Sequence, residues 1–122
     1  MLNHVNMMGR LVADPTMKMT KNNVSVASFR IACDRDIGEK KTDFFNCTAW
    51  RQTAEFISQN FRKGQMIVIS GRIQNNDWED KDGNKRTTAE ILVEHAYFCQ
   101  KAESQVSESK FTEIIDDEDV PF

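Results

Sequence analysis

The sequence predicts an all-β fold: a small five-stranded barrel with one short helix between the third and fourth strands. Three observations lead to this prediction. In five segments hydrophobic residues alternate with polar ones or form short β-branched runs, as in strands that bury one face. One segment instead repeats its hydrophobic residues every three or four positions, which is typical of a helix. With 122 residues, 39% of them hydrophobic, the chain is long enough for one such core and too short for two.

The first two strands are expected at residues 2–13 and 24–34. Pro15 should end the first, because proline has no N–H for a sheet ladder. A polar turn at residues 21–23 then leads into the second strand. The residues expected to face inward are Val5, Met7, Leu11, Ala13, Ala27, Phe29, Ile31 and Cys33.

A charged loop at residues 35–43 should connect the second strand to a third at residues 44–50, and a helix follows. The repeating hydrophobic residues of this helix are Ala54, Ile57 and Phe61. Residues 62–63 and Gly64 come next, and they predict a basic last turn with a glycine at the C-terminal cap.

The fourth and fifth strands are expected at residues 65–74 and 86–99, joined by a hairpin with a turn at Asp82-Gly83. In the fifth strand Ala89, Ile91, Val93 and Tyr97 should face inward. Three strands, a helix and two further strands, in this order, are typical of the OB-fold, a Greek-key barrel that binds oligonucleotides or oligosaccharides.

Acidic and basic residues are unevenly divided along the chain. Residues 1–100 carry 14 lysines and arginines against 12 acidic residues, whereas residues 101–122 carry 2 against 7. The net charge of −3 therefore originates in the C-terminal part, and such asymmetry predicts a body and a tail with different partners. We expect residues 1–100 to form the barrel, residues 101–112 a disordered linker and residues 113–122 an acidic docking tail.

Aromatic side chains in polar surroundings indicate a nucleic-acid site. Trp78 lies within the polar segment 75–80, where core packing explains a tryptophan poorly. Trp50 ends the third strand and Phe44 opens it; core packing is the alternative for Trp50. Proteins bind single strands without reading sequence by stacking bases on aromatics and holding phosphates with cations. The candidate cations are Arg10, Lys18, Lys21, Arg30, Arg35, Arg51, Arg72, Lys85 and Arg86, any one of which could instead be ordinary solvated surface.

Catalysis and metal binding find no support in the motifs. The three cysteines, Cys33, Cys47 and Cys99, are too widely spaced for a zinc pair and odd in number, so we expect them to be small buried hydrophobes. No nucleophile elbow, phosphate-binding loop or zinc-protease motif is present. We therefore expect a non-enzymatic protein without a cofactor or metal.

The last seven residues have a chemistry of their own. Four acidic residues precede a Val-Pro-Phe end, which places an apolar ring beside the terminal carboxylate. Such an end suits a hydrophobic pocket with a basic rim on another protein. A solubilising tail is the alternative, although solubility requires no Pro-Phe end. The predicted docking residues are Asp116, Asp117, Glu118, Asp119, Val120, Pro121 and Phe122.

Motifs along nearly the whole chain match one family. The opening at residues 1–15, the segments 24–29 and 44–55, the hairpin 78–83 and the acidic end resemble bacterial and phage single-stranded DNA-binding proteins. The resemblance implies that Phe44, Trp50 and Trp78 are base-stacking positions, and that the chain binds single-stranded DNA in replication, recombination and repair. It also implies a homotetramer that recruits other proteins through its tail. The short linker favours a phage or prophage member.

Two other functions stay open. An OB-fold adaptor for protein assembly would bind nucleic acid weakly, and an RNA-binding protein would carry similar stacking aromatics. The chain shows no apolar stretch of the roughly 20 residues that a membrane helix needs, and no secretory signal. We expect a cytoplasmic protein of a bacterium, or of the host cytoplasm if the chain comes from a phage.

Overall fold

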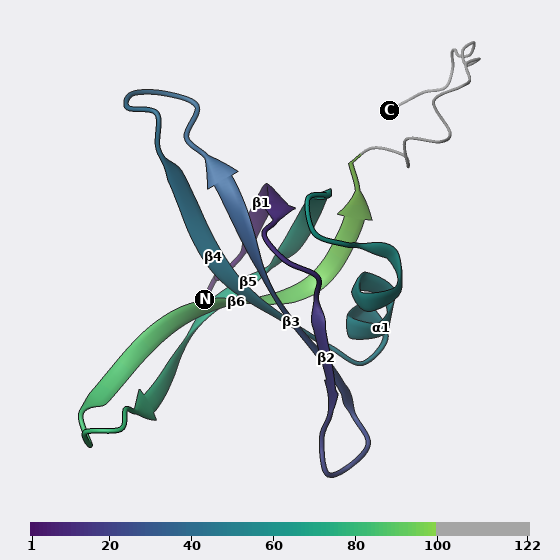
Figure 1. Cartoon of the computed structure of the whole chain (residues 1–122), viewed down its shortest axis with the longest axis vertical. Helices are drawn as coiled ribbons and strands as arrows, with labels where there is room; N and C mark the ends of the chain where they lie inside the picture. Colours follow the sequence, from purple (N-terminus) through teal and green to yellow (C-terminus); the bar gives the residue numbers. More distant parts are fainter. Residues whose placement is uncertain (100–122) are drawn as a thin grey trace.

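A computed structural model describes residues 1–99 (Figure 1). The linker and tail predicted at residues 101–122 lie outside these described residues. In chain order the elements are β1 (Val5–Leu11), β2 (Thr16–Met19), β3 (Ser25–Asp34), β4 (Thr42–Trp50), α1 (Arg51–Asn60), β5 (Met66–Glu79) and β6 (Lys85–Phe98). No helix in this part of the chain is long and apolar enough to cross a membrane.

Five of these strands close into a barrel. β1 pairs antiparallel with both β5 and β3, β3 with β4, and β5 with β6. A parallel ladder between β4 and β6 completes the circuit β1–β5–β6–β4–β3–β1. α1 lies between β4 and β5, the third and fourth strands of the barrel. The predicted OB-fold is confirmed.

The barrel core is built from the inward residues of the alternating strands. The prediction is confirmed for Leu11, Phe29 and Ile31, which are 2%, 7% and 0% exposed, and α1 contributes Ala54 and Ile57. The other buried hydrophobic residues are Ala27, Cys47, Ala49, Phe61, Ile67, Ile69, Ile91 and Val93. The prediction of three buried cysteines is wrong for two of them. Cys47 is buried, whereas Cys33 and Cys99 are only partly covered.

β2 is a sixth strand that the sequence pattern does not predict. It follows Pro15 and pairs antiparallel with β3, from Thr16 opposite Ser28 to Met19 opposite Ser25. Three of its four residues are exposed. Since a strand without a buried face needs no alternation of hydrophobic and polar residues, its sequence carries no strand signal.

The helix ends earlier than predicted. α1 stops at Asn60, and the extended Phe61 caps it by donating its N–H to the carbonyl of Ile57 at 3.0 Å. Residues 62–63 therefore lie beyond the helix, and Gly64 occupies a separate turn at φ 88°. Its N–H donates to the carbonyl of Leu11 at 2.9 Å. The predicted basic last turn and glycine cap are wrong, because Phe61 leaves the helix to bury its ring.

A bulge interrupts β6. Ser70 pairs with His95, but the next residue, Gly71, pairs with Val93, so that Glu94 is an extra residue in β6. A one-residue insertion of this kind transfers all later side chains to the opposite face.

The bulge explains why the predicted inward series fails at Tyr97. This side chain is 52% exposed, whereas its neighbour Ala96 packs against the core. Phe98, although itself 55% exposed, lies beside Phe61 with ring centroids 5.1 Å apart. Ile91 and Val93 are buried as predicted, whereas the prediction is wrong for Ala89, which lies on the projecting hairpin and is exposed. After Val93 the bulge reverses the alternation.

The β3–β4 and β5–β6 hairpins project from the barrel in different directions (Figure 1). β5 continues to Glu79, five residues beyond the predicted end at Gln74. Its last residues are polar, but they pair with the start of β6, and the Thr87 hydroxyl donates to Asp77 at 2.8 Å. The predicted turn is confirmed, with Gly83 at φ 83°. The candidate site lies on and between these hairpins.

Candidate nucleic-acid interface

Two of the three predicted platforms lie on the outward face of β4. Phe44 and Trp50 are 49% and 44% exposed, while the intervening Cys47 and Ala49 point into the barrel. Core packing, the alternative for Trp50, is therefore excluded. At about 3.3 Å per residue the two rings are separated by about 20 Å along the strand, which leaves room for more than one base between them.

Cations flank these aromatics on the neighbouring strands. The guanidinium carbon of Arg30 lies 4.7 Å from the ring centroid of Phe44, a cation–π distance. Lys18 of β2 pairs with Val26, which pairs in turn with Trp50, so that these three residues form one row across the sheet.

Arg10 lies in a second row, which runs through Ala32 to Phe44. Its guanidinium donates to the carbonyl of Gly64 at 2.8 Å, so one donor group is already engaged within the protein.

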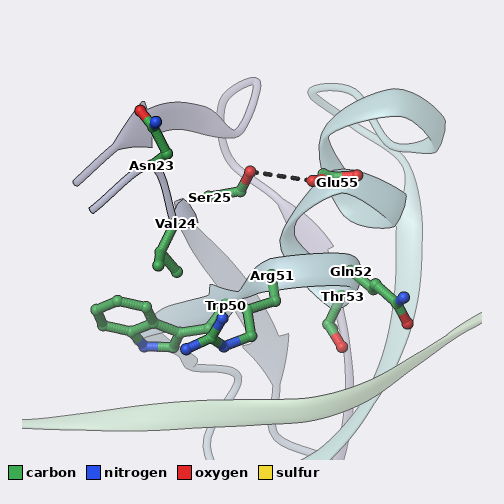
Figure 2. A pocket seen from close by; sticks show the side chains of 8 residues that line it. All are labelled: Asn23, Val24, Ser25, Trp50, Arg51, Gln52, Thr53 and Glu55. Carbon is green, nitrogen blue, oxygen red and sulfur yellow. Dashed lines mark hydrogen bonds between the residues drawn. The ribbon is translucent and has the colours of Figure 1, made fainter. Parts of the chain in front are cut away.

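A pocket of about 540 Å³ opens beside Trp50. In Figure 2 Trp50 and Arg51 lie on the same side of this pocket. The backbone of Arg51 has φ 57°, a conformation that is uncommon for residues other than glycine. Ser25 and Glu55 also line this pocket, and the hydroxyl of Ser25 donates to Glu55 at 3.1 Å and joins β3 to α1. The pocket combines an exposed indole with a guanidinium, the two groups that hold a base and a phosphate.

Trp78, the third platform, lies on the β5–β6 hairpin and is 49% exposed. Its indole N–H donates to the hydroxyl of Thr88 at 2.8 Å, which fixes the ring against the ladder. Its cross-strand partner is Arg86, whose Nε donates to Asp80 at 3.0 Å. Lys85 lies next to Arg86 at the start of β6.

Asp80 organises the tip of this hairpin. Its carboxylate accepts the N–H groups of Asn84 at 2.9 Å and Asp82 at 3.0 Å, in addition to the bond from Arg86. The N–H of Asn84, followed by Arg86, lowers the pKa of Asp80 below its ordinary value of 3.8.

The remaining candidate cations are less well placed. Arg35 forms a two-pronged ion pair with Asp43, with bonds of 2.9 and 3.0 Å, which raises the pKa of Arg35. Lys21 lies in the turn after β2, and Arg72 lies on β5 opposite Leu92. The structure thus brings Lys18, Arg30 and Arg51 close to the platforms of β4 and Lys85 and Arg86 close to Trp78. Arg35 and Arg86 are each engaged with a carboxylate.

A polar network between the platforms was missed by the sequence reasoning. Glu90 of β6 accepts hydrogen bonds from the hydroxyl of Thr48 at 2.9 Å, from the amide of Gln74 at 3.3 Å and from the amide of Asn76. We call these four residues the Glu90 network. The sequence did contain a signal for part of this network. If the two strands are paired about the predicted Asp82-Gly83 turn, Gln74 lies opposite Glu90. Within residues 1–99 no cluster of three or more His, Cys, Asp or Glu side chains could hold a metal.

A small OB-fold barrel with exposed aromatics and cations on its outside has the architecture of an oligonucleotide-binding protein. The family model described as "Single-strand binding protein family" matches residues 2–99. The chain belongs to this family, as the sequence resemblance indicated.

Individual relatives agree with this assignment. A single-stranded DNA-binding protein of Oceanobacillus iheyensis is 38% identical over 109 residues, which cover 86% of this chain and 68% of the relative. Single-stranded DNA-binding protein 2 of Listeria monocytogenes is 36% identical over 110 residues, or 87% of this chain and 69% of the relative. Single-stranded DNA-binding protein 1 of Streptococcus pyogenes is 33% identical across the full length of both chains.

Proposed function

We propose that this protein binds single-stranded DNA of any sequence, stacking bases on Phe44, Trp50 and Trp78. The observation that carries the proposal is the exposure of all three rings, between 44% and 49%, on the outside of one barrel. Stacking contributes about 1–3 kcal/mol per base and tolerates any base, since each has an aromatic face. Family membership and the names of the relatives support DNA as the ligand.

The phosphate chain would be held by the cations beside the rings. Lys18, Arg30 and Arg51 serve the stretch along β4, and Lys85 and Arg86 serve the stretch at Trp78. Arg10, Lys21 and Arg72 would extend the path, while Arg35 would first have to leave Asp43 and Arg86 would first have to leave Asp80. Neutralised phosphates release counterions, so binding should weaken as salt rises.

In the cell the protein would coat unpaired DNA during replication, recombination and repair. The acidic end, Asp116 to Phe122, would recruit enzymes of these processes through its terminal carboxylate and apolar ring. The protein would act without catalysis, as a homotetramer in the cytoplasm. Sequence resemblance supports the tetramer and the tail, and membership of a binding family supports the absence of catalysis.

The quickest test is a fluorescence titration of the full chain with oligo-dT. Bases that stack on Trp50 and Trp78 should quench their emission to saturation, and unchanged emission would argue against both platforms. Competition with an RNA oligomer of matched sequence tests the RNA-binding alternative. An adaptor that binds nucleic acid only weakly would fail to saturate. Light scattering with and without DNA then measures assembly state and stoichiometry together.

A further inference from the structure

A cavity opens where the two hairpins separate. β4 and β6 pair in parallel only from Cys47 opposite Ile91 to Ala49 opposite Val93. Before these residues the strands diverge with their hairpins (Figure 1). The space between them is a cavity of about 330 Å³. The lining residues that matter here are Phe44, Asn46, Ile73, Thr88 and Glu90.

Aromatic, aliphatic, amide and carboxylate groups meet in this cavity. Phe44 offers an exposed ring, and Ile73, itself 45% exposed, adds an apolar contact. Asn46 and Glu90 contribute an amide and a carboxylate. An aromatic platform with polar groups at its edge can read the edge of a base that stacks on the ring, in addition to holding its face.

Glu90 is held in place but is not saturated. Thr48, Gln74 and Asn76 donate to its two oxygens, whereas an ionised carboxylate offers about four acceptor positions. One position therefore remains for a donor from a ligand. Because the network comes from three strands, the carboxylate is oriented before a ligand arrives.

The charge of Glu90 excludes a phosphate from this position. The ion pairs found within residues 1–99 are Arg35–Asp43 and Arg86–Asp80, so no cation neutralises Glu90. An uncompensated carboxylate repels phosphate and attracts hydrogen-bond donors. On a surface that otherwise carries cations beside its aromatics, this position suits a base and not the backbone.

We propose that this cavity is a base-binding subsite that favours a base carrying an exocyclic amine. The proposal rests on the proposed single-stranded DNA binding and adds a bias at one position. The base stacks on Phe44 and donates its amine to Glu90. Cytosine and adenine carry such an amine, whereas thymine presents a carbonyl oxygen at the corresponding position, which the carboxylate repels.

The test compares oligo-dC with oligo-dU of equal length, because the two bases differ at ring position 4 and neither carries the thymine methyl group. The titration is made at neutral to mildly alkaline pH, where cytosine is unprotonated. The wild-type full chain should bind oligo-dC about threefold to tenfold more tightly, which is the usual net contribution of one hydrogen bond. Equal affinities would overturn the subsite and leave DNA binding intact, whereas failure to bind either oligomer would overturn the proposed function itself.

Glu90→Gln separates recognition from simple repulsion. If Glu90 recognises the amine, the variant should bring the ratio of the two affinities close to one. If the carboxylate only repels DNA, both oligomers should bind more tightly by the same factor and the ratio should persist, which would overturn the proposal. Glu39→Gln, in the exposed β3–β4 loop, makes the same change in charge outside the network and should preserve the ratio.

A change in the ligand keeps the test independent of folding. Oligo-dC with N4,N4-dimethylcytosine has no donor at the amine, and the wild-type chain should bind it no more tightly than oligo-dU. Retention of the full cytosine advantage would contradict recognition by Glu90.

Discussion

The guanidinium of Arg30 covers the ring of Phe44 at 4.7 Å from its centroid, and so places a positive charge directly at an exposed aromatic platform. If this charge holds a phosphate, Arg30→Met should weaken binding of oligo-dT. The plot of log K against log salt concentration should also become less steep, by about 0.7, which is the value for one phosphate contact on a single strand. Fluorescence titrations over a series of salt concentrations measure both effects.

The control for this prediction is Arg62→Met. Arg62 lies in the turn after α1 and donates to the carbonyl of Phe61 at 2.8 Å, away from the platforms. An equal loss of slope in both variants would show that Arg30 acts only through the net charge of the protein.

Trp78 should be a major contributor to affinity. Trp78→Ala should weaken binding by about 1–3 kcal/mol, the contribution of one stacked base, whereas Trp78→Phe should retain much of the affinity. Thr88→Val removes the acceptor of the indole N–H but leaves the ring, so its effect should be smaller. Titrations with oligo-dT compare the three variants, and an unchanged affinity in Trp78→Ala would remove this residue from the site.

The parts of the fold that the sequence predicts are those with one buried face. Leu11, Phe29 and Ile31 recur with the period of a strand because the barrel core requires it. β2 and the end of β5 are stabilised by ladder hydrogen bonds, which leave no mark on hydrophobic periodicity. The bulge at Glu94 depends on the close approach of Gly71 to Leu92, where a Cβ would lie 2.0 Å from the Leu92 carbonyl oxygen. Such a contact between strands is not visible along the chain.

The candidate site, like the fold, could be predicted from the sequence only in part. Trp78 is conspicuous in the sequence because it is a large aromatic in a polar setting, whereas for Trp50 only the structure excludes core packing. Glu90 is an ordinary strand residue until the fold places Thr48, Gln74 and Asn76 around it. Arg35 looks as good a cation as Arg30, and only the structure shows that Asp43 engages it.

The β5–β6 tip should lose stability in acid. Asp80 has a folded-state pKa below 3.8, caused first by the N–H of Asn84 and then by Arg86. Its contribution to stability is therefore complete above pH 3.8 and is lost as the pH falls through the lower folded-state value. Asp80→Ala should be less stable at neutral pH and should show a weaker dependence on acid. Thermal unfolding across this range measures both, and identical acid dependence in the two proteins would contradict the prediction.

Cys47 should resist thiol reagents in the folded protein. Burial raises its pKa to about 12, so almost no thiolate forms at mildly alkaline pH, and the thiolate is the reactive form. Cys99, which is partly exposed, should be alkylated first. Peptide mass spectrometry after iodoacetamide treatment, with and without denaturant, follows each cysteine. Equal rates for Cys47 and Cys99 without denaturant would contradict the protection.

Deletion of residues 116–122 should tighten DNA binding at low salt. The deletion removes four acidic side chains, which would otherwise compete with phosphates for the basic surface. Replacing only Val120, Pro121 and Phe122 with alanine keeps these charges and should leave the affinity unchanged. If the deletion also leaves it unchanged, the tail acts in partner docking alone.

The parallel pairing of β4 with β6 has a kinetic consequence. Each projecting hairpin consists of neighbours in the chain and can form early, but Cys47 and Ile91 meet only after the intervening helix and β5 have been enclosed. Contacts between such distant residues carry the largest loop-closure cost and slow folding. Phe44 and Trp78 belong to different hairpins, so we expect the complete DNA-binding surface to arise only in the last step of folding. A partly folded chain would stack single bases without holding a strand.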